Sequence, residues 1–276
     1  MSAVTMPRST SLSFPRLIRS EWIKLRSVRS TVWCYAIVVV LTLAMAYLLG
    51  VVDTGVPRGA PATAANQLIV TIGTASVSLT ALVVGVLGVL IITGEYGTGQ
   101  IRSTFTADPG RTGAVLAKAF VLALTTFVVS AVSTWIGVAI SAALQAGRDI
   151  RPDLADPAVF MPILGSSVYV TLVALLAFGI GLLVKSSAGG IAITLGILLV
   201  LPIIVSVFAG LTNQQWIADL SEFLPSSAGA QLYTFDSGPP QGDGLHLDGW
   251  GGFGVLAGEV VVIGAIALAA ARTRDV

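Results

Sequence analysis

The residue types that most often carry catalysis are scarce in this sequence. Its 276 residues include one histidine, His246, and one cysteine, Cys34, which together cannot build an ordinary zinc site or a Cys–His nucleophile pair. No Gly-Lys-Ser or Gly-Lys-Thr sequence occurs, so the P-loop that cradles nucleotide phosphates is absent. The sequence therefore predicts a protein that is not an enzyme and that has no cofactor or metal of its own.

One carboxylate stands out because it lies within a long apolar run. Glu259 follows Trp250 by nine residues, which is roughly 13 Å along a helix at 1.5 Å per residue. Acidic side chains inside a membrane are costly and usually face a cavity or a partner. Glu259 is therefore a candidate contact on a substrate or ion path. The alternative is a structural hydrogen bond to a neighbouring helix, or an acid that stays protonated.

The composition indicates the environment of these residues. Only 15 basic and 14 acidic residues are present, so 11% of the chain is charged against about 25% in average soluble proteins. The hydrophobic fraction is 55% and the mean hydropathy is +0.90, which excludes a disordered chain. A net charge of +1 gives no basic excess for binding nucleic acid. The sequence predicts an integral membrane protein.

Six runs are long and apolar enough to cross a bilayer as helices, so we predict an all-α membrane protein. Pro202 predicts a kink in the fifth run. Residues 1–12 are expected to form a flexible cytoplasmic N-terminus, and residues 13–276 a single transmembrane domain. The runs lie at about 31–52, 68–93, 112–144, 159–184, 188–211 and 250–271.

The basic residues predict the orientation of the chain. With the N-terminus inside, twelve of the fifteen Lys and Arg residues fall on the cytoplasmic side and three fall outside. Both termini are then cytoplasmic, in agreement with an even number of crossings. We expect a multi-pass protein of a bacterial plasma membrane.

The segment before the first run has the pattern of a helix lying in the membrane interface. Apolar residues, Trp22 among them, recur from Phe14 to Val28 along one helical face, and basic residues occupy the other. The alternative is a basic flank that only sets the topology. Glu21, Trp22, Lys24, Arg26 and Arg29 are the candidate residues of this interfacial element.

Two further segments are not spans. Residues 93–111 are polar, and Thr98 could cap a short helix that Asp108-Pro109-Gly110 ends, with Ile101 and Phe105 on one face. A solvated connector is the alternative. Residues 212–249 carry no Lys or Arg, and their first half, which Pro225 breaks, is amphipathic enough for a short re-entrant pair.

Three stretches of the chain resemble permease subunits of ABC-2-type exporters, especially actinobacterial ones. Ser20-Glu21-Trp22-Ile23-Lys24-Leu25-Arg26-Ser27 is similar to the N-terminal elbow helix of that family. Gly94-Glu95-Tyr96-Gly97-Thr98-Gly99-Gln100-Ile101-Arg102, followed by Pro109-Gly110-Arg111 and Ala117-Lys118, is similar to its cytoplasmic loop and to the basic start of its third helix. Arg272-Thr273-Arg274-Asp275 resembles its usual ending.

The resemblance implies a division of labour between subunits. Two permease subunits would pair, as a homodimer, and two ABC ATPase subunits with their ATP and Mg would bind below them. The loop would hold the coupling helix, with Glu95 at its membrane base. The residues implied in ATPase coupling are Glu95, Tyr96, Gln100, Ile101, Arg102, Phe105 and Arg111.

The leading hypothesis is thus a permease that moves a hydrophobic or amphipathic solute, such as a drug, antibiotic, peptide or lipid, out of the cell. Two alternatives remain open at this stage. One is an ion-coupled secondary carrier that uses Glu259. The other is a membrane scaffold or sensor that does not transport.

Overall fold

The computed structural model describes residues 13–52, 56–57, 59–101, 112–212, 214–236 and 245–273. Over these residues the chain forms helices and no strand, in agreement with the predicted all-helical class. Residues 1–12, predicted to be a flexible N-terminus, lie outside the described part. The helices are α1 (Phe14–Ser27), α2 (Arg29–Val51), α3 (Ala62–Thr74), α4 (Val77–Gly97), α6 (Thr112–Ala146), α7 (Pro157–Val184), α8 (Ser187–Leu195), the π-helix η1 (Gly196–Val200), α9 (Leu201–Thr212), α10 (Gln215–Ser221), α11 (Pro225–Ala230) and α12 (Gly249–Thr273).

Six helical stretches in the described residues are long and apolar enough to cross a membrane, which confirms the predicted number. The second, Ala62–Gly97, begins earlier than the apolar run at 68 and is divided into α3 and α4 at Ala75 and Ser76. The fifth, Ser187–Thr212, joins α8, η1 and α9. A chain of this kind satisfies its backbone hydrogen bonds within each helix, as a bilayer requires.

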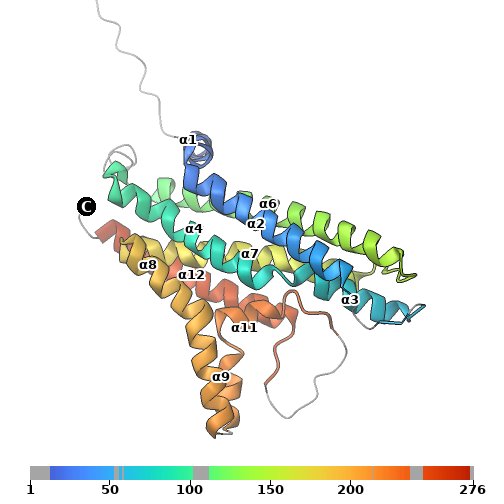
Figure 1. The fold of residues 1–276 in the computed structure, drawn as a ribbon. Helices are drawn as coiled ribbons and strands as arrows, with labels where there is room; N and C mark the ends of the chain where they lie inside the picture. The colour runs from blue at the N-terminus through green and yellow to red at the C-terminus, as the bar shows by residue number, and fades with distance from the viewer. Residues whose placement is uncertain are drawn as a thin grey trace, which may run out of the picture.

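Helix α7 lies in the middle of the bundle and packs against α3, α4, α6, α8 and α12 (Figure 1). The contact with α4 is close because Gly88 has no side chain. A Cβ atom at this position would lie 2.4 Å from the carbonyl oxygen of Ala174 on α7. The backbones of the two helices therefore meet directly, and the largest buried apolar cluster forms around them.

The fifth span changes direction part of the way along. Helix α9 turns away from the bundle and forms an arm (Figure 1). The turn follows η1, which ends two residues before Pro202. Proline has no N–H to donate, and its ring clashes with the carbonyl four residues earlier, so regular α geometry is lost at this point. None of the residues of α9 is buried.

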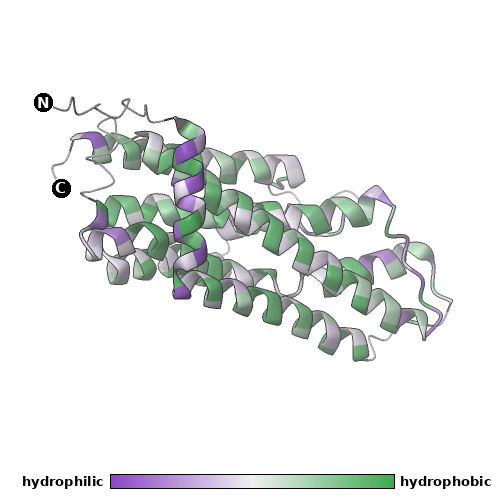
Figure 2. Cartoon of the chain, turned by 90° about the horizontal axis from the view of Figure 1, so that it is seen from above, coloured by the Kyte–Doolittle hydropathy of each residue, from purple (hydrophilic) through white to green (hydrophobic). Residues whose placement is uncertain are grey.

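The membrane-spanning helices are hydrophobic along most of their length (Figure 2). Large exposed hydrophobic side chains occur on α2, α6, α9 and α12. Trp33 near the start of α2 is 68% exposed, and Trp250 at the opposite end of the bundle is 79% exposed. Apolar helix surfaces with tryptophan at both ends are typical of chains embedded in a bilayer, where the rings lie at the two interfaces.

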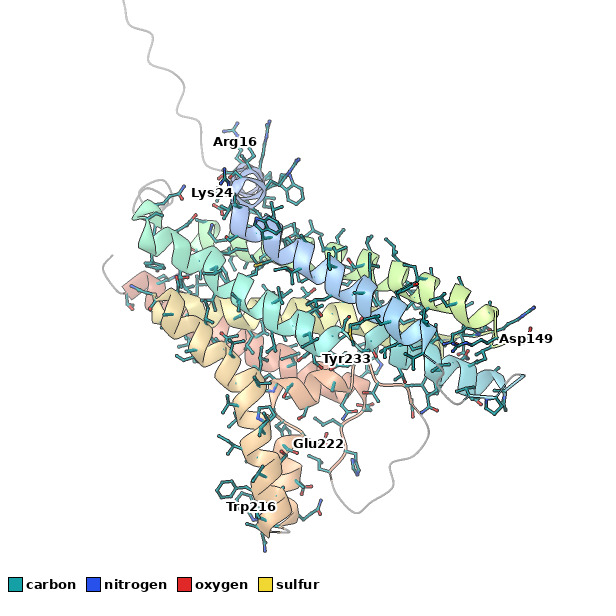
Figure 3. All side chains as sticks on the ribbon, in the orientation of Figure 1. Arg16, Lys24, Asp149, Trp216, Glu222 and Tyr233 are labelled. Atoms are coloured by element: carbon teal, nitrogen blue, oxygen red, sulfur yellow. The ribbon has the colours of Figure 1, made fainter. Side chains whose placement is uncertain are left out.

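Two elements lie outside the regular spans. Helix α1 is viewed along its axis in Figure 1 and crosses the bundle in Figure 2, where its hydrophilic and hydrophobic residues alternate around the helix. The segment predicted as a re-entrant pair forms two short helices, α10 and α11, on either side of residues 222–224. Trp216 of α10 lies at the tip of the arm (Figure 3).

Candidate functional site

The candidate site lies at the end of the bundle where α2 begins, α4 ends and α6 begins. Helix α1 starts with Pro15 in its first turn and ends at Ser27, because Val28 is extended and separates it from α2. One residue of α1 is buried, and it is the acidic Glu21. Since α1 packs mainly on α6, this carboxylate is directed into the protein rather than toward the solvent.

Four charged side chains from three helices meet at this place. Lys118 of α6 donates hydrogen bonds to Glu21 Oε2 of α1 and, at 2.8 Å, to Glu95 Oε1 of α4. Lys24 of α1 donates to Glu21 Oε1 at 2.8 Å and to Glu95 Oε1 at 3.0 Å. We call Glu21, Lys24, Glu95 and Lys118 the ionic cluster. Its formal charges sum to zero, and it ties α1 to α4 and α6.

Three of the four side chains are removed from solvent. Glu21, Lys118 and Glu95 are 5%, 7% and 8% exposed, whereas Lys24 is 29% exposed. A buried ion pair gains little over an apolar contact, but an isolated buried charge is costly. The four charges therefore depend on one another, and removal of one leaves a partner without compensation.

This arrangement, beside the label of Lys24 in Figure 3, favours the charged form of Lys24. Burial alone would lower the pKa of Lys24. The hydrogen bonds and negative charges of Glu21 and Glu95 outweigh that effect and raise the pKa above the usual 10.5. Lys24 therefore keeps its positive charge throughout the physiological pH range.

A cavity of about 390 Å³ adjoins the cluster. Its lining includes the four charged residues together with Ser30, Thr98 and Gln100. Glu95 Oε2 is buried there, and no described residue donates a hydrogen bond to it. The charged groups consequently have free space on one side.

The residues predicted for the interfacial helix divide into two sets. Glu21 and Lys24 belong to the ionic cluster. Trp22, Arg26 and Arg29 are exposed. Of the apolar residues along the same face, Phe14 and Val28 at the two ends are also exposed, whereas Leu17, Ile18 and Leu25 between them are partly buried.

The residues predicted for ATPase coupling also divide. The Tyr96 ring is partly buried and lies under Lys185, whose Nζ is 5.4 Å from the ring centre. Gln100 is exposed. Ile101 is 2% exposed and joins the apolar core, so in this conformation it packs within the chain and does not present its side chain to a partner. Arg102, Phe105 and Arg111 lie outside the described residues.

Thr98, predicted to cap a short helix, directly follows the last residue of α4. Its hydroxyl donates to the carbonyl of Gly94 at 2.9 Å, so it completes the last turn of α4. Gly99 then reverses the chain with a φ of +71°, and Gln100 and Ile101 are helical again. The rest of the short helix that Thr98 was predicted to cap lies outside the described residues.

Lys118 is the member of the site that sequence reasoning did not single out as functional. Its signal in the sequence was that it is the one charge in the apolar run from 112 to 144. A charge in such a run needs partners, but the nearest in the sequence, Glu95, is 23 residues away and Glu21 is 97 residues away. These partners become visible only once α1, α4 and α6 are assembled.

Glu259 lies on α12 and is not among the residues that line the cavity beside the cluster. Its Oε2 is buried, and no described residue donates a hydrogen bond to it. It lines a separate cavity between α7, the π-helix region, α11 and α12. The structural hydrogen bond to a neighbouring helix considered from the sequence is not formed at this oxygen.

A model of a known protein family matches the part of the chain that contains the ionic cluster. The model of the ABC-2 family transporter protein matches residues 17–201, about two thirds of the chain. The match includes all four residues of the ionic cluster and ends before α12 and Glu259. A search of curated proteins found no significant match. Six membrane-spanning helices agree with a multi-pass transporter subunit. The chain therefore belongs to the ABC-2 family of transporter proteins.

Proposed function

We propose that this chain is the permease subunit of an ATP-driven exporter that moves a hydrophobic or amphipathic solute out of the cell. ATP, with Mg, is hydrolysed on separate ATPase subunits, two per assembly, and two copies of this chain form the permease. In this arrangement the end of the bundle that carries the ionic cluster faces the cytoplasm of the bacterial plasma membrane.

The observation that supports the proposal is the position of the ionic cluster beside segment 102–111. Glu95 lies two residues before the end of α4, and Lys118 lies six residues after the start of α6, roughly 9 Å along the helix. The segment that joins these two helices is the one whose residues resemble the family's coupling loop. The cluster residues on α4 and α6 therefore lie within two helical turns of the segment. A force applied to the segment would act on the cluster through both helices.

The cluster supplies a rigid connection for that force. Because Glu21 and Glu95 share Lys118 and Lys24, a displacement of α4 or α6 that does not carry α1 along would break buried ion pairs. Closure of two ATPases beneath the membrane would then move α1, α4 and α6 together. The bundle would respond by opening the space between the two permease subunits outward.

The exposed apolar faces are consistent with two permease copies in a lipid bilayer. Ile203, Val207 and Phe208 of α9 and Val261 of α12 are all at least half exposed. Such surfaces need either lipid chains or another apolar helix surface to cover them. In a homodimer surrounded by lipid, the partner copy covers some of these surfaces and lipid chains cover the rest. Helix α1 then lies at the cytoplasmic interface of the membrane.

Affinity purification of the chain from its own cells tests the proposal. A protein with a P-loop, identified by peptide mass spectrometry, should co-purify together with ATP hydrolysis. Arg102→Glu and Phe105→Asp should each lower its yield by roughly tenfold, because charge reversal or a buried carboxylate at a docking surface opposes binding.

Arg151→Glu is the matched control, since Arg151 is exposed at the opposite end of the bundle. It reverses the same type of charge and should leave the yield of the ATPase unchanged. The proposal is contradicted if no P-loop protein accompanies the wild-type chain, or if Arg151→Glu lowers the yield as much as Arg102→Glu.

A further inference from the structure

The cavity that contains Glu259 is apolar apart from this carboxylate. It measures about 400 Å³, within the range of roughly 300–1,000 Å³ for sites that take drug-sized ligands. Leu176 of α7, Ile197 and Leu201 around η1, Leu224 and Pro225 before and in α11, and Ile263 of α12 contribute to its wall. Glu259 is the one charged residue among the described residues that line it.

One oxygen of the Glu259 carboxylate has no partner in the fold. Its Oε2 is buried without a hydrogen-bond donor among the described residues. An unpaired buried acceptor costs free energy, and a buried charge costs more, unless a partner is supplied. The described residues of the apolar wall supply none, which leaves this oxygen free for a ligand that enters the cavity.

The cavity is also open to the surface of the membrane-spanning helices. Leu201 and Val262, which line it, are 38% and 57% exposed. An apolar molecule dissolved in the bilayer can therefore reach the cavity from the side. The π-helix η1 contributes Ile197 to the wall, and π-helical turns within α-helices frequently occur at functional sites.

We propose that this cavity binds an amphipathic organic cation, whose positive group pairs with Glu259 and whose apolar body fills the space between α7, η1 and α11. The electrostatic attraction is strong here because the surrounding side chains are hydrocarbon. This inference rests on the proposed export function and names the class of solute. It assigns selection by charge to Glu259 and selection by size to the apolar wall.

The site is tested by binding of tetraphenylphosphonium to the full chain in nanodiscs of phosphatidylcholine, whose surface has no net charge. Tetraphenylborate is the matched probe, with the same shape and the opposite charge. The wild-type chain should bind the phosphonium saturably, and tetraphenylborate should not compete. Glu259→Gln should weaken binding by roughly tenfold or more, whereas Glu259→Asp, which keeps the charge, should lose less.

Two further variants separate the site from general effects on the fold. Glu222→Gln removes an acid outside the cavity and should leave phosphonium binding unchanged. Leu201→Trp keeps Glu259 but fills the mouth of the cavity, so it should also weaken binding. This variant tests the site even if Glu259→Gln does not fold. Equal binding in wild type, Glu259→Gln and Leu201→Trp would overturn the inference, and so would equal competition by tetraphenylborate.

The binding assay needs no ATPase and no nucleotide, so it is independent of the test of the export function. If a P-loop ATPase co-purifies but the phosphonium is not distinguished from the borate, the cation site is wrong and the exporter stands. If the cation binds through Glu259 but no ATPase accompanies the chain, the site stands and the ATP-driven mechanism is wrong.

Discussion

Lys118 Nζ lies 2.8 Å from Glu95 Oε1, and in the sequence these two residues stand on either side of segment 102–111. The same ammonium group bonds to Glu21, which comes from the helix that precedes the first span. A single lysine thus joins the two helices that the segment connects to the helix that crosses them. In the proposed mechanism Lys118 connects the three helices, so one substitution at this residue removes the connection.

Lys118→Met should destabilise the chain strongly. The change leaves Glu21 and Glu95 buried with only Lys24 as a partner, and breaking a buried ion pair costs roughly 3 kcal/mol or more. The measurement is the free energy of unfolding in detergent micelles by denaturant titration. Adding Glu95→Gln to Lys118→Met should recover part of the loss, because it removes one of the uncompensated charges.

Lys185→Met is the control for that experiment. Lys185 lies at the same end of the bundle and contacts the Tyr96 ring, a contact of about 0.5–1 kcal/mol at a partly exposed place. If Lys118→Met destabilises the chain no more than Lys185→Met does, the cluster does not hold the three helices together.

Lys24 should keep its proton to a higher pH than an ordinary lysine. Its folded-state pKa is raised above 10.5, so its contribution to stability is complete below the unfolded value and is lost as the pH rises through the higher folded value. The chain has three lysines, and selective ¹⁵N labelling of them allows each to be followed by NMR. Glu21→Gln should lower the pKa of Lys24, because it removes a negative charge and weakens a hydrogen bond. An unchanged titration in Glu21→Gln would show that this carboxylate does not act on Lys24.

Substitution by alanine should affect stability differently at two glycines of α4. Gly88→Ala places a methyl group 2.4 Å from the Ala174 carbonyl oxygen, and overpacking of this kind costs about 1–3 kcal/mol. A Cβ at Gly94 meets no atom within 4 Å, so Gly94→Ala should be neutral or stabilise the helix by up to about 1 kcal/mol. Thermal unfolding of the two variants in the same detergent measures the difference. Equal effects of the two substitutions would show that α4 and α7 do not meet at Gly88.

The sequence predicted the spans because the property that identifies them is local. A run of about 20 apolar residues is visible without knowing its neighbours, and so is the basic helix that contains Glu21 and Lys24. The π-helix before Pro202 was foreseen only as a kink, since proline fixes where regularity ends but not which geometry replaces it.

The candidate site required the assembled bundle. Glu21 has the appearance of a solvated residue on a basic helix, and its burial follows only from the packing of α1 on α6. Ile101 was expected to face a partner because it would share a helical face with Phe105 and because the family resemblance implies a coupling helix, yet it packs into the core. The surroundings of Glu259 were equally hidden, because its cavity is formed by four elements that are distant in the sequence.

The central claim is that ATP moves the helices of this chain through the ionic cluster, and an interspin distance tests it most directly. Replacing Cys34 by alanine leaves no cysteine, so a spin label at Leu211→Cys, 77% exposed near the tip of the arm, reports the distance between two copies. In complexes with the co-purified ATPase, ATP should change this distance in the wild-type background. In Lys118→Met the ATPase should still bind, but the distance should stay constant. An ATP-dependent change of the same size in Lys118→Met would contradict the account.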